Sequence, residues 1–202
     1  MNGQGKPVIA PGCTKILDVG CGDGGALAES KVPRGALVIA TDISLSALKT
    51  CRERFPSSFY VCSSAERLPY RSEAFDAYLA RSFWPYTDLP KTTQEAARVL
   101  APGGYLWVST RTGAAALRWL AANWEKRYAH GIIFQLYVLW NGLMLHLTGR
   151  NFKFPFRWPG TSRYESFHTP HAVRHLLRRA GFDEIRITKR RFMEVTARKS
   201  PA

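Results

Sequence analysis

The chain has 202 residues, 46% hydrophobic and 12% aromatic, which suits one folded domain over 1–202 and excludes wholesale disorder. Its formal net charge of +14 is uneven: residues 1–111 hold 13 basic and 10 acidic residues, whereas 112–202 hold 16 and 5. A basic half suits RNA, an anionic membrane surface or an acidic substrate, or is simply a soluble surface.

Targeting and cysteine signals point to a reducing compartment. The opening residues MNGQGKPVIAPG contain neither an apolar core nor a small-residue cleavage site, so we expect no secretory signal and a cytoplasmic protein. The cysteines have no CxxC or Cys/His ligand spacing, and we therefore expect free thiols. They are Cys13, Cys21, Cys51 and Cys62.

Short apolar runs alternate with helical patterns along the chain. Strands are predicted over 16–19, 36–40, 59–62, 75–80 and 105–109, with an antiparallel pair over 184–188 and 192–197. Helices are predicted over 26–31, 44–55, 92–100 and 171–180. Ser44 is the expected cap of the second helix, and Pro102-Gly103-Gly104 is expected to stop the third. This alternation predicts an α/β fold of βαβ units, with helices on both faces of a parallel sheet.

A mostly helical insertion, 113–168, precedes the last predicted helix. It holds two helical patterns, 114–128 and 130–149. In the second pattern, one stripe consists of Ile133, Leu136, Tyr137, Trp140, Leu143, Met144 and Leu147, and the apolar residues off that stripe are Phe134, Val138, Leu139 and Leu145. A helix that is apolar nearly all round is buried, paired or in lipid. A lid over the active site, a dimer face, a peripheral membrane contact through 130–148 and a membrane span, poor because of its polar interruptions, all stay open.

The stretch KILDVGCGDGG places four glycines directly after the first predicted strand. Ligands of open α/β sheets bind beyond the carboxyl ends of the strands, where glycine permits positive φ and close approach of a ligand. Asp18 lies within this motif and disfavours a pyrophosphate, which points to a ligand with an amino group. Asp42 ends the second strand, where a carboxylate accepts hydrogen bonds from ribose hydroxyls. An amine-bearing nucleoside indicates S-adenosylmethionine over NAD or ATP.

Four stretches now resemble a known family: ILDVGCGDGG, VIATDIS, AERLPYRSEAFDAYLA and EAARVLAPGGYLWVST. They are similar to the successive motifs of class I S-adenosylmethionine-dependent methyltransferases, in particular the type 11 family, which includes ubiquinone and menaquinone C-methyltransferases. The resemblance implies a methyltransferase with a Rossmann-like, seven-stranded, mainly parallel sheet. It further implies a cofactor-binding core over 15–111, an insertion or lid over 113–168 and a closing helix and strand pair over 169–202.

The resemblance also implies which residues bind the cofactor. In chain order these are Asp18, Gly20, Cys21, Gly22, Gly24, Asp42, Ile43, Ser64, Ala65, Glu66 and Arg81. Asp42 would hold the ribose, Ile43 would pack on the adenine, and Arg81 would offer its backbone. Ser64 takes the place of an aspartate in the family's GDAE stretch. Pro85 and Tyr86 stand where many members carry a histidine pair.

Methyl transfer is an in-line displacement that needs positioning, and a base only when the acceptor loses a proton. The candidate bases are Tyr86, Tyr164, His168 and His171. His171 and His175 lie at i, i+4, but with no third ligand evident we predict no metal site.

The acceptor is open to two main readings. The apolar, Trp-rich insertion favours a small lipophilic or aromatic acceptor, and nearby Arg150, Lys153, Arg157 and Arg163 suit an acidic group or an anionic bilayer. The basic C-terminal half keeps an RNA (tRNA) acceptor open. A homodimer and a non-catalytic cofactor-binding protein are further alternatives.

Overall fold

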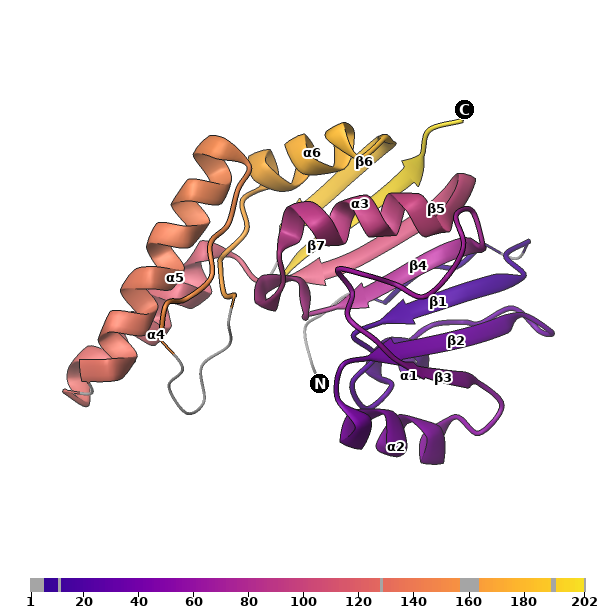
Figure 1. Ribbon diagram of the computed structural model, residues 1–202, viewed down its shortest axis with the longest axis horizontal. Helices are drawn as coiled ribbons and strands as arrows, with labels where there is room; N and C mark the ends of the chain where they lie inside the picture. The colour runs from indigo at the N-terminus through magenta and orange to yellow at the C-terminus, as the bar shows by residue number, and fades with distance from the viewer. Residues whose placement is uncertain (1–5, 11, 128, 157–163, 190–191, 202) are drawn as a thin grey trace.

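The computed structural model describes residues 6–10, 12–127, 129–156, 164–189 and 192–201. Its centre is one seven-stranded sheet in the order β3-β2-β1-β4-β5-β7-β6 (Figure 1). The strands are β1 (Lys15–Val19), β2 (Leu37–Asp42), β3 (Phe59–Cys62), β4 (Phe75–Arg81), β5 (Leu100–Thr110), β6 (Phe182–Lys189) and β7 (Met193–Lys199). β3, β2, β1, β4 and β5 pair in parallel, whereas β7 pairs antiparallel with β5 and β6. The predicted α/β fold is confirmed.

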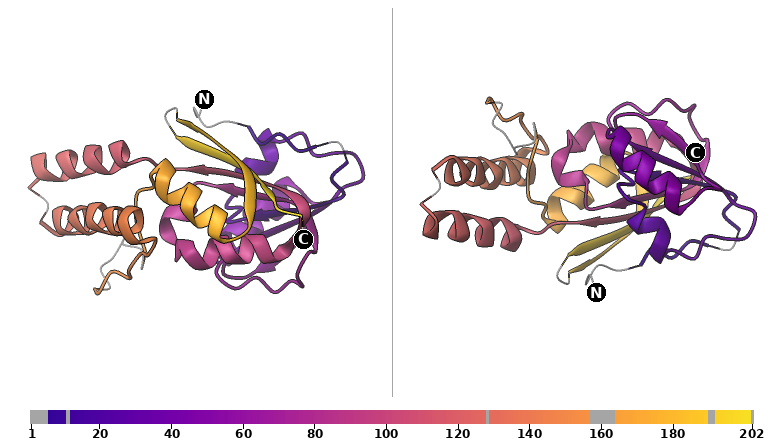
Figure 2. Two further views of the ribbon diagram at one scale, coloured as in Figure 1. Left: turned by 90° about the horizontal axis from the view of Figure 1, so that it is seen from above. Right: turned by 90° about the horizontal axis from the view of Figure 1, so that it is seen from below.

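Helices cover both faces of this sheet (Figure 2). They are α1 (Gly25–Glu29), α2 (Leu45–Arg54), α3 (Leu89–Val99) and α6 (Pro170–Arg179), with a short 3₁₀ turn, η1 (Trp84–Tyr86), after β4. α3 and α6 share one hydrophobic core with the sheet, and α1 and α2 share another. From Ala77 to Ala80 of β4, successive residues alternate between the two cores, as the period of two along a strand requires. Both faces of the parallel strands are therefore buried, which explains their near-continuous apolar runs.

Two predicted boundaries of the third helix were wrong. α3 begins at Leu89 rather than residue 92, because Asp88 caps it by accepting a hydrogen bond from the Lys91 backbone N–H and Pro90 fits the first turn. It ends at Val99, and Pro102-Gly103-Gly104 lies inside β5. The pairing of β4 with β5 shifts its register here, an irregularity that accommodates proline and glycine within a strand.

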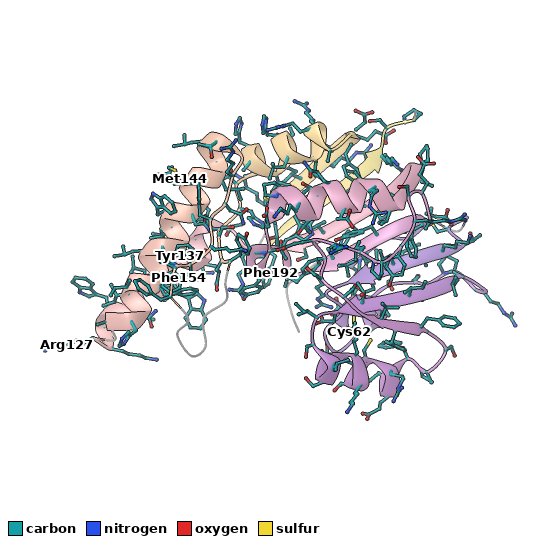
Figure 3. All side chains as sticks on the ribbon, viewed as in Figure 1. Cys62, Arg127, Tyr137, Met144, Phe154 and Phe192 are labelled. Carbon is teal, nitrogen blue, oxygen red and sulfur yellow. The ribbon has the colours of Figure 1, made fainter. Side chains whose placement is uncertain are left out.

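The insertion is an antiparallel helical hairpin that extends away from the sheet (Figures 1 and 2). It consists of α4 (Gly113–Glu125) and α5 (Ala129–Thr148), which pack side by side. A small core of its own forms around Ala116, Phe134, Val138 and Phe154. Figure 3 shows Tyr137 and Phe154 together on the hairpin, and their ring centroids are 4.8 Å apart. Arg157 and Arg163, named above, and residue 128, the last of the first predicted helix of the insertion, lie outside the described residues.

The inward face of α5 is not the predicted stripe. Among its buried residues are Phe134, Val138, Asn141 and Leu145, whereas the stripe residues Ile133, Leu136, Trp140, Leu143 and Leu147 are exposed. By length and composition α5 is also apolar enough to cross a membrane, with a mean hydropathy of 1.3, although the core helix of a soluble protein can meet the same criterion.

One ion pair fixes the segment that follows β3. Glu95 on α3 pairs with Arg98 at 2.7 Å and accepts a hydrogen bond from the backbone N–H of Leu68. Arg98 donates to the carbonyl oxygens of Leu68 and Tyr70. Hydrogen bonds from Arg98, with the Leu68 N–H, hold the pKa of Glu95 below its ordinary value despite partial burial. The segment is thereby tied to α3 along residues 68–70.

We expect Glu95→Ala to lower the free energy of unfolding by about 2 kcal/mol near neutral pH, because it removes charge-assisted hydrogen bonds in a partly buried place. Since the folded pKa of Glu95 is depressed, its contribution is present above the unfolded pKa of about 4.3 and lost as pH falls through the folded value. Urea denaturation of wild type and Glu95→Ala, at neutral pH and at a pH below the folded pKa of Glu95, measures this contribution. Glu53→Ala, at an exposed position, is the control. An equal deficit at acid pH would contradict the explanation.

Candidate functional site

The glycine turn connects β1 to α1 at the point where the strand order reverses. Gly20, Gly22 and Gly24 have φ of +61°, +55° and +85°, so the predicted need for positive φ is confirmed. A Cβ on Gly20 would lie 2.4 Å from the ring of Phe83. At Gly22 the space beyond the backbone is open. The turn thus packs a phenylalanine against one glycine and leaves another accessible to a ligand.

Asp42 joins the ends of β1 and β2. Its Oδ2 accepts a hydrogen bond of 2.9 Å from the Gly22 N–H, and its Oδ1 accepts one of 2.9 Å from the Ser44 N–H. Ser44 in turn caps α2, as its sequence position predicts, by accepting from the Ala47 N–H. A carboxylate has about four acceptor positions, so Asp42 retains capacity for further donors.

Two cavities lie on either side of Gly20. The first, of about 260 Å³, is lined by Val19, Gly20, Asp42, Ile43, Ser63, Ser64, Ala65, Glu66, Phe83, Tyr86 and Thr87. The second, of about 360 Å³, is lined by Gly20, Cys21, Gly22, Asp23, Gly25, Ala28, Glu29, Arg54, Arg81 and Ser82. Gly20 lines both, and we call the two cavities together the groove; it lies at the carboxyl ends of β1, β2 and β4, where ligands of such sheets bind.

Nine of the eleven predicted cofactor residues line these two cavities. Ile43 is 77% exposed at the first cavity, which leaves an apolar surface free for a flat ligand group. The other two predicted residues are Asp18, which is completely buried, and Gly24, which faces the ring of Phe55 at the start of α1.

The carboxyl group of Asp18 is a buried group without a partner. Neither of its oxygens has a hydrogen bond among the described residues. Burial first, and Asp42 second, raise the pKa of Asp18 to about 8, although Arg81 opposes this. Because an isolated buried carboxylate is costly, Asp18 stays protonated near neutral pH in the free protein. A cationic ligand group above the glycine turn would favour its ionised form.

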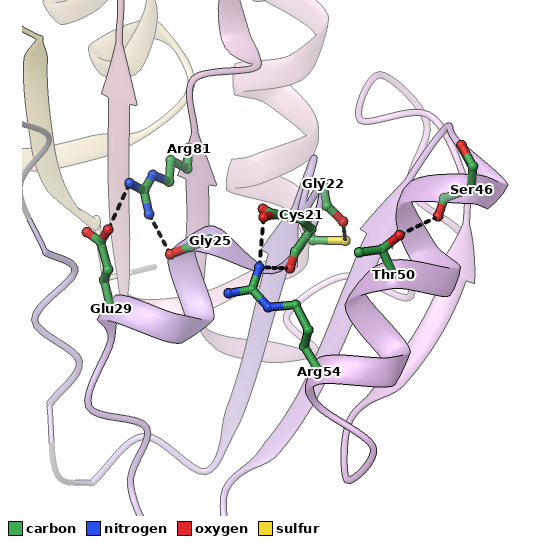
Figure 4. Close-up of polar contacts among 9 residues, drawn as sticks. Cys21, Gly22, Gly25, Glu29, Ser46, Thr50, Arg54 and Arg81 are labelled. Atoms are coloured by element: carbon green, nitrogen blue, oxygen red, sulfur yellow. Dashed lines mark hydrogen bonds and ion pairs between the residues drawn. The ribbon is translucent and has the colours of Figure 1, made fainter. Parts of the chain in front are cut away.

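Two arginines form hydrogen bonds and ion pairs with the end of the glycine turn and with α1 (Figure 4). Arg54 on α2 bonds to the Asp23 carbonyl oxygen and pairs with its carboxylate at 2.7 Å. Arg81 donates to the Gly25 carbonyl oxygen and pairs with Glu29 at 3.0 Å. The contribution of Arg81 seen here comes from its side chain, whereas the sequence predicted a backbone role. Both arginines fix α1 and the turn relative to neighbouring elements.

Cys21 lines the second cavity as a buried thiol. All four cysteines are free, as predicted. Burial, followed by the nearby charge of Asp18, raises the pKa of the Cys21 thiol far above its ordinary value. Cys21 therefore stays protonated and cannot act as a thiolate nucleophile.

A chain of contacts connects the first cavity to the insertion. Glu66 accepts a hydrogen bond of 2.7 Å from the Asp88 N–H, and the Tyr164 hydroxyl donates to the Asp88 carboxylate at 3.3 Å. Asn151 donates to the Thr87 carbonyl oxygen, and the Ser166 N–H donates to that of Pro85. The returning end of the insertion thus borders the cavity rim, although the lining contains none of the insertion's described residues.

The candidate bases are not gathered in one place. Tyr86 lines the first cavity, with the Arg111 guanidinium 4.9 Å from its ring centroid. Burial, and the charge of Asp88, raise the pKa of Tyr164 to about 12, which does not suit a base. Burial lowers the pKa of His168 to about 3 and keeps it neutral inside the fold. His171 stacks with His175 on α6 and lines neither cavity.

Sequence reasoning missed Ser63, Phe83 and Thr87, which also line the first cavity. Phe83 and Thr87 flank η1, immediately after β4. The run SFWPYT, with proline directly after a strand, is a turn signal that could have indicated this wall.

Comparison with known proteins shows which family the segment that forms this groove belongs to. The family model for a methyltransferase domain of type 11 matches residues 17–108. This segment is a class I, type 11 methyltransferase domain. The family and the fold indicate S-adenosylmethionine as the cofactor of the methyltransferase domain, confirming the resemblance read from the four motifs.

Two curated relatives illustrate how far the similarity extends. The chain is 36% identical over 121 residues to a biotin biosynthesis bifunctional protein, BioHC, of Cellvibrio japonicus, covering 58% of this chain and 24% of that protein. It is 37% identical over 115 residues to the human mitochondrial ubiquinone biosynthesis O-methyltransferase, covering 52% of this chain and 30% of that protein. The chain thus spans less than a third of the length of either relative.

A solved structure shows the same fold over almost the whole chain. A SAM-dependent methyltransferase from Methanosarcina mazei superposes with a TM-score of 0.63 at 21% identity, covering 96% of this chain and 95% of the other. At this identity the likeness concerns the fold, a seven-stranded, mostly parallel sheet with helices.

The groove of the methyltransferase domain fits S-adenosylmethionine on two observations. The unpartnered Asp18 carboxyl, beneath the turn, suits a ligand that carries positive charge. Asp42 and the exposed Ile43 together suit a ribose beside a flat base. The groove therefore fits a nucleoside ligand that carries positive charge, as S-adenosylmethionine does.

We predict that Asp18 makes the stability of the ligand-free domain fall as pH rises. Its folded pKa of about 8 exceeds the unfolded value of about 3.9, so its contribution is complete below about pH 4 and is lost as pH rises toward 8. The slope approaches about 1.4 kcal/mol per pH unit within this window. Comparing wild type with Asp18→Asn by urea denaturation isolates this effect from other groups. Parallel curves for the two proteins would show that Asp18 is ionised in the fold.

Proposed function

We propose that this chain transfers a methyl group from S-adenosylmethionine to a small lipophilic or aromatic acceptor. The observation that carries the proposal is the groove around Gly20. It is lined by the Asp42 carboxylate and the exposed Ile43, and the buried Asp18, whose carboxyl has no hydrogen bond among the described residues, lies next to its glycine turn in the same methyltransferase domain.

The residues of the groove act mainly by binding and orientation. S-adenosylmethionine supplies a methyl group on a positively charged sulfur, which departs as a neutral thioether and needs no acid. Asp42 and Ile43 hold the nucleoside end, while Gly20 and Gly22 let the remainder lie against the backbone. Holding two reactants in line is itself worth a large part of the barrier.

A proton is removed only if the acceptor carries one at the reacting atom. Tyr86 is the member of the candidate set that faces the first cavity, and the Arg111 guanidinium lies over its ring. For an acceptor that is already deprotonated or nucleophilic, Tyr86 instead provides an aromatic wall. Tyr164 acts through Asp88 and is a positioning residue.

The apolar character of the surroundings supports a lipophilic acceptor. Phe83 and Tyr86 line the first cavity, and the hairpin α4–α5 adds exposed aromatic side chains at the same end of the molecule. The human relative is named for ubiquinone biosynthesis, which is compatible with an acceptor of this class. The RNA alternative rests on net charge alone, since the described basic residues of 112–189 are divided among α4, the two ends of α5, α6 and β6.

Transfer of radiolabel from methyl-labelled S-adenosylmethionine into a cell extract tests the proposal. The extract is separated into organic-solvent, RNA and protein fractions. We expect label in the organic fraction. We also expect Asp42→Ala to raise the cofactor's dissociation constant at least about tenfold, because it removes a charged acceptor, with Glu53→Ala as the control.

Each outcome of this experiment is decisive in combination with thermal denaturation of the variant. Label in RNA would replace the acceptor proposal with the RNA alternative. Cofactor binding without label in any fraction would favour a non-catalytic protein. Unchanged cofactor affinity in a folded Asp42→Ala protein would refute the assignment of the ribose site.

A further inference from the structure

The outward face of α5 is an exposed apolar surface. Its exposed residues, Ile133, Leu136, Trp140, Leu143 and Leu147, recur at spacings of three and four and therefore lie along one side of the helix. Trp140 is joined by Phe152, whose ring centroid is 5.2 Å away. Leu117, Trp119 and Trp124 of α4 are also exposed. A row of exposed large apolar side chains along one side of a helix is typical of an interaction site.

Cations lie at both ends of this helix. Lys126 and Arg127 precede α5, and Arg150 and Lys153 follow it. Figure 3 shows Arg127 at the outer tip of the hairpin, as far from the sheet as the hairpin reaches. The sequence from 113 to 156 contains one acidic residue, Glu125, against five lysines and arginines. The α5 face is therefore apolar between two basic ends.

This charge pattern selects among the partners that an apolar helix could have. Two copies of the chain that paired along the α5 face would bring two strongly basic hairpins together with little negative charge to offset them. An anionic surface matches both features at once. Apolar and tryptophan side chains enter the acyl boundary, and long basic side chains reach lipid phosphates.

The structure also distinguishes a helix lying on a membrane from one that spans it. The opposite face of α5 is occupied, because Phe134 and Val138 are buried in the hairpin core. Asn141 on that face donates to the carbonyl oxygens of Phe152 and Glu165 and accepts from the Phe152 N–H. A spanning helix would have to abandon these contacts, whereas a helix lying in the interface keeps them.

We propose that the α5 face docks the protein on an anionic lipid bilayer, with the helix axis in the plane of the interface. Docking requires neither the cofactor nor methyl transfer, so it is tested separately from the proposed reaction. If the acceptor is lipophilic, docking would also bring the groove close to the phase in which such a molecule dissolves.

Vesicle flotation of the whole chain without cofactor tests this proposal. The probes are phosphatidylcholine vesicles with and without phosphatidylglycerol. We expect binding to the anionic vesicles, at least tenfold weaker binding to the neutral ones, and a decrease with added salt. Leu136→Glu/Leu143→Glu should reduce anionic binding at least tenfold. Leu45→Glu is the matched control, since Leu45 is 64% exposed on α2, outside the hairpin, and should bind like wild type.

A second variant separates the charges from the apolar face. Arg127→Gln/Arg150→Gln should weaken anionic binding and reduce its salt dependence while leaving binding to neutral vesicles unchanged. Circular dichroism and cofactor binding verify that each variant is folded. Equal binding of wild type and Leu136→Glu/Leu143→Glu would overturn the proposal. If wild type did not bind vesicles but formed dimers, and if Leu136→Glu/Leu143→Glu abolished those dimers, the α5 face would instead be assigned to contact with a second copy of the chain.

Discussion

The groove depends on the two hydrogen bonds that the Asp42 carboxylate accepts from backbone N–H groups. Its two oxygens accept backbone N–H groups from the glycine turn after β1 and from the start of α2, so one side chain sets the separation of two strand ends. The turn can follow this path because its glycines adopt positive φ, where Phe83 packs in the space that a Cβ of Gly20 would take. Without that carboxylate, two backbone donors at the site would lose their acceptor.

Other carboxylates connect the elements around this junction by further hydrogen bonds. Glu95 with Arg98 ties residues 68–70 to α3, and Glu66 accepts from the Asp88 N–H at the start of the same helix. Asp88 both caps α3 and receives the Tyr164 hydroxyl from the end of the insertion. The wall of the first cavity, the third helix and the insertion therefore form one connected unit. A change at Asp88 would reach all three.

Local signals in the sequence predicted the features that local chemistry determines. The apolar runs, the Ser44 cap and the glycine turn specify their own backbone, and the structure confirms each of them. The start of α3 was missed because the buried face that begins at Leu89 continues through two polar residues, Thr92 and Thr93, which hide its period in the sequence. Glu66 contacts a residue that lies 22 positions away in the chain, and Arg81 contacts two residues that lie 52 and 56 positions away. No local pattern in the sequence encodes such contacts. The roles of individual residues toward the cofactor stay predictions.

The orientation of α5 shows why a count of apolar residues misleads on a helix that is apolar all round. The rotation of α5 about its axis is fixed by two residues that are not part of its hydrophobic stripe. Asn141 must face the backbone of residues 152 and 165 to satisfy its amide, and Gly142 must face Phe167, since a Cβ there would lie 2.3 Å from that ring. These two demands place Phe134, Val138 and Leu145 inward. The larger apolar stripe is then turned outward as a consequence of the packing, and the solvent exposure of leucine and tryptophan along it is a cost that a lipid or protein surface would remove.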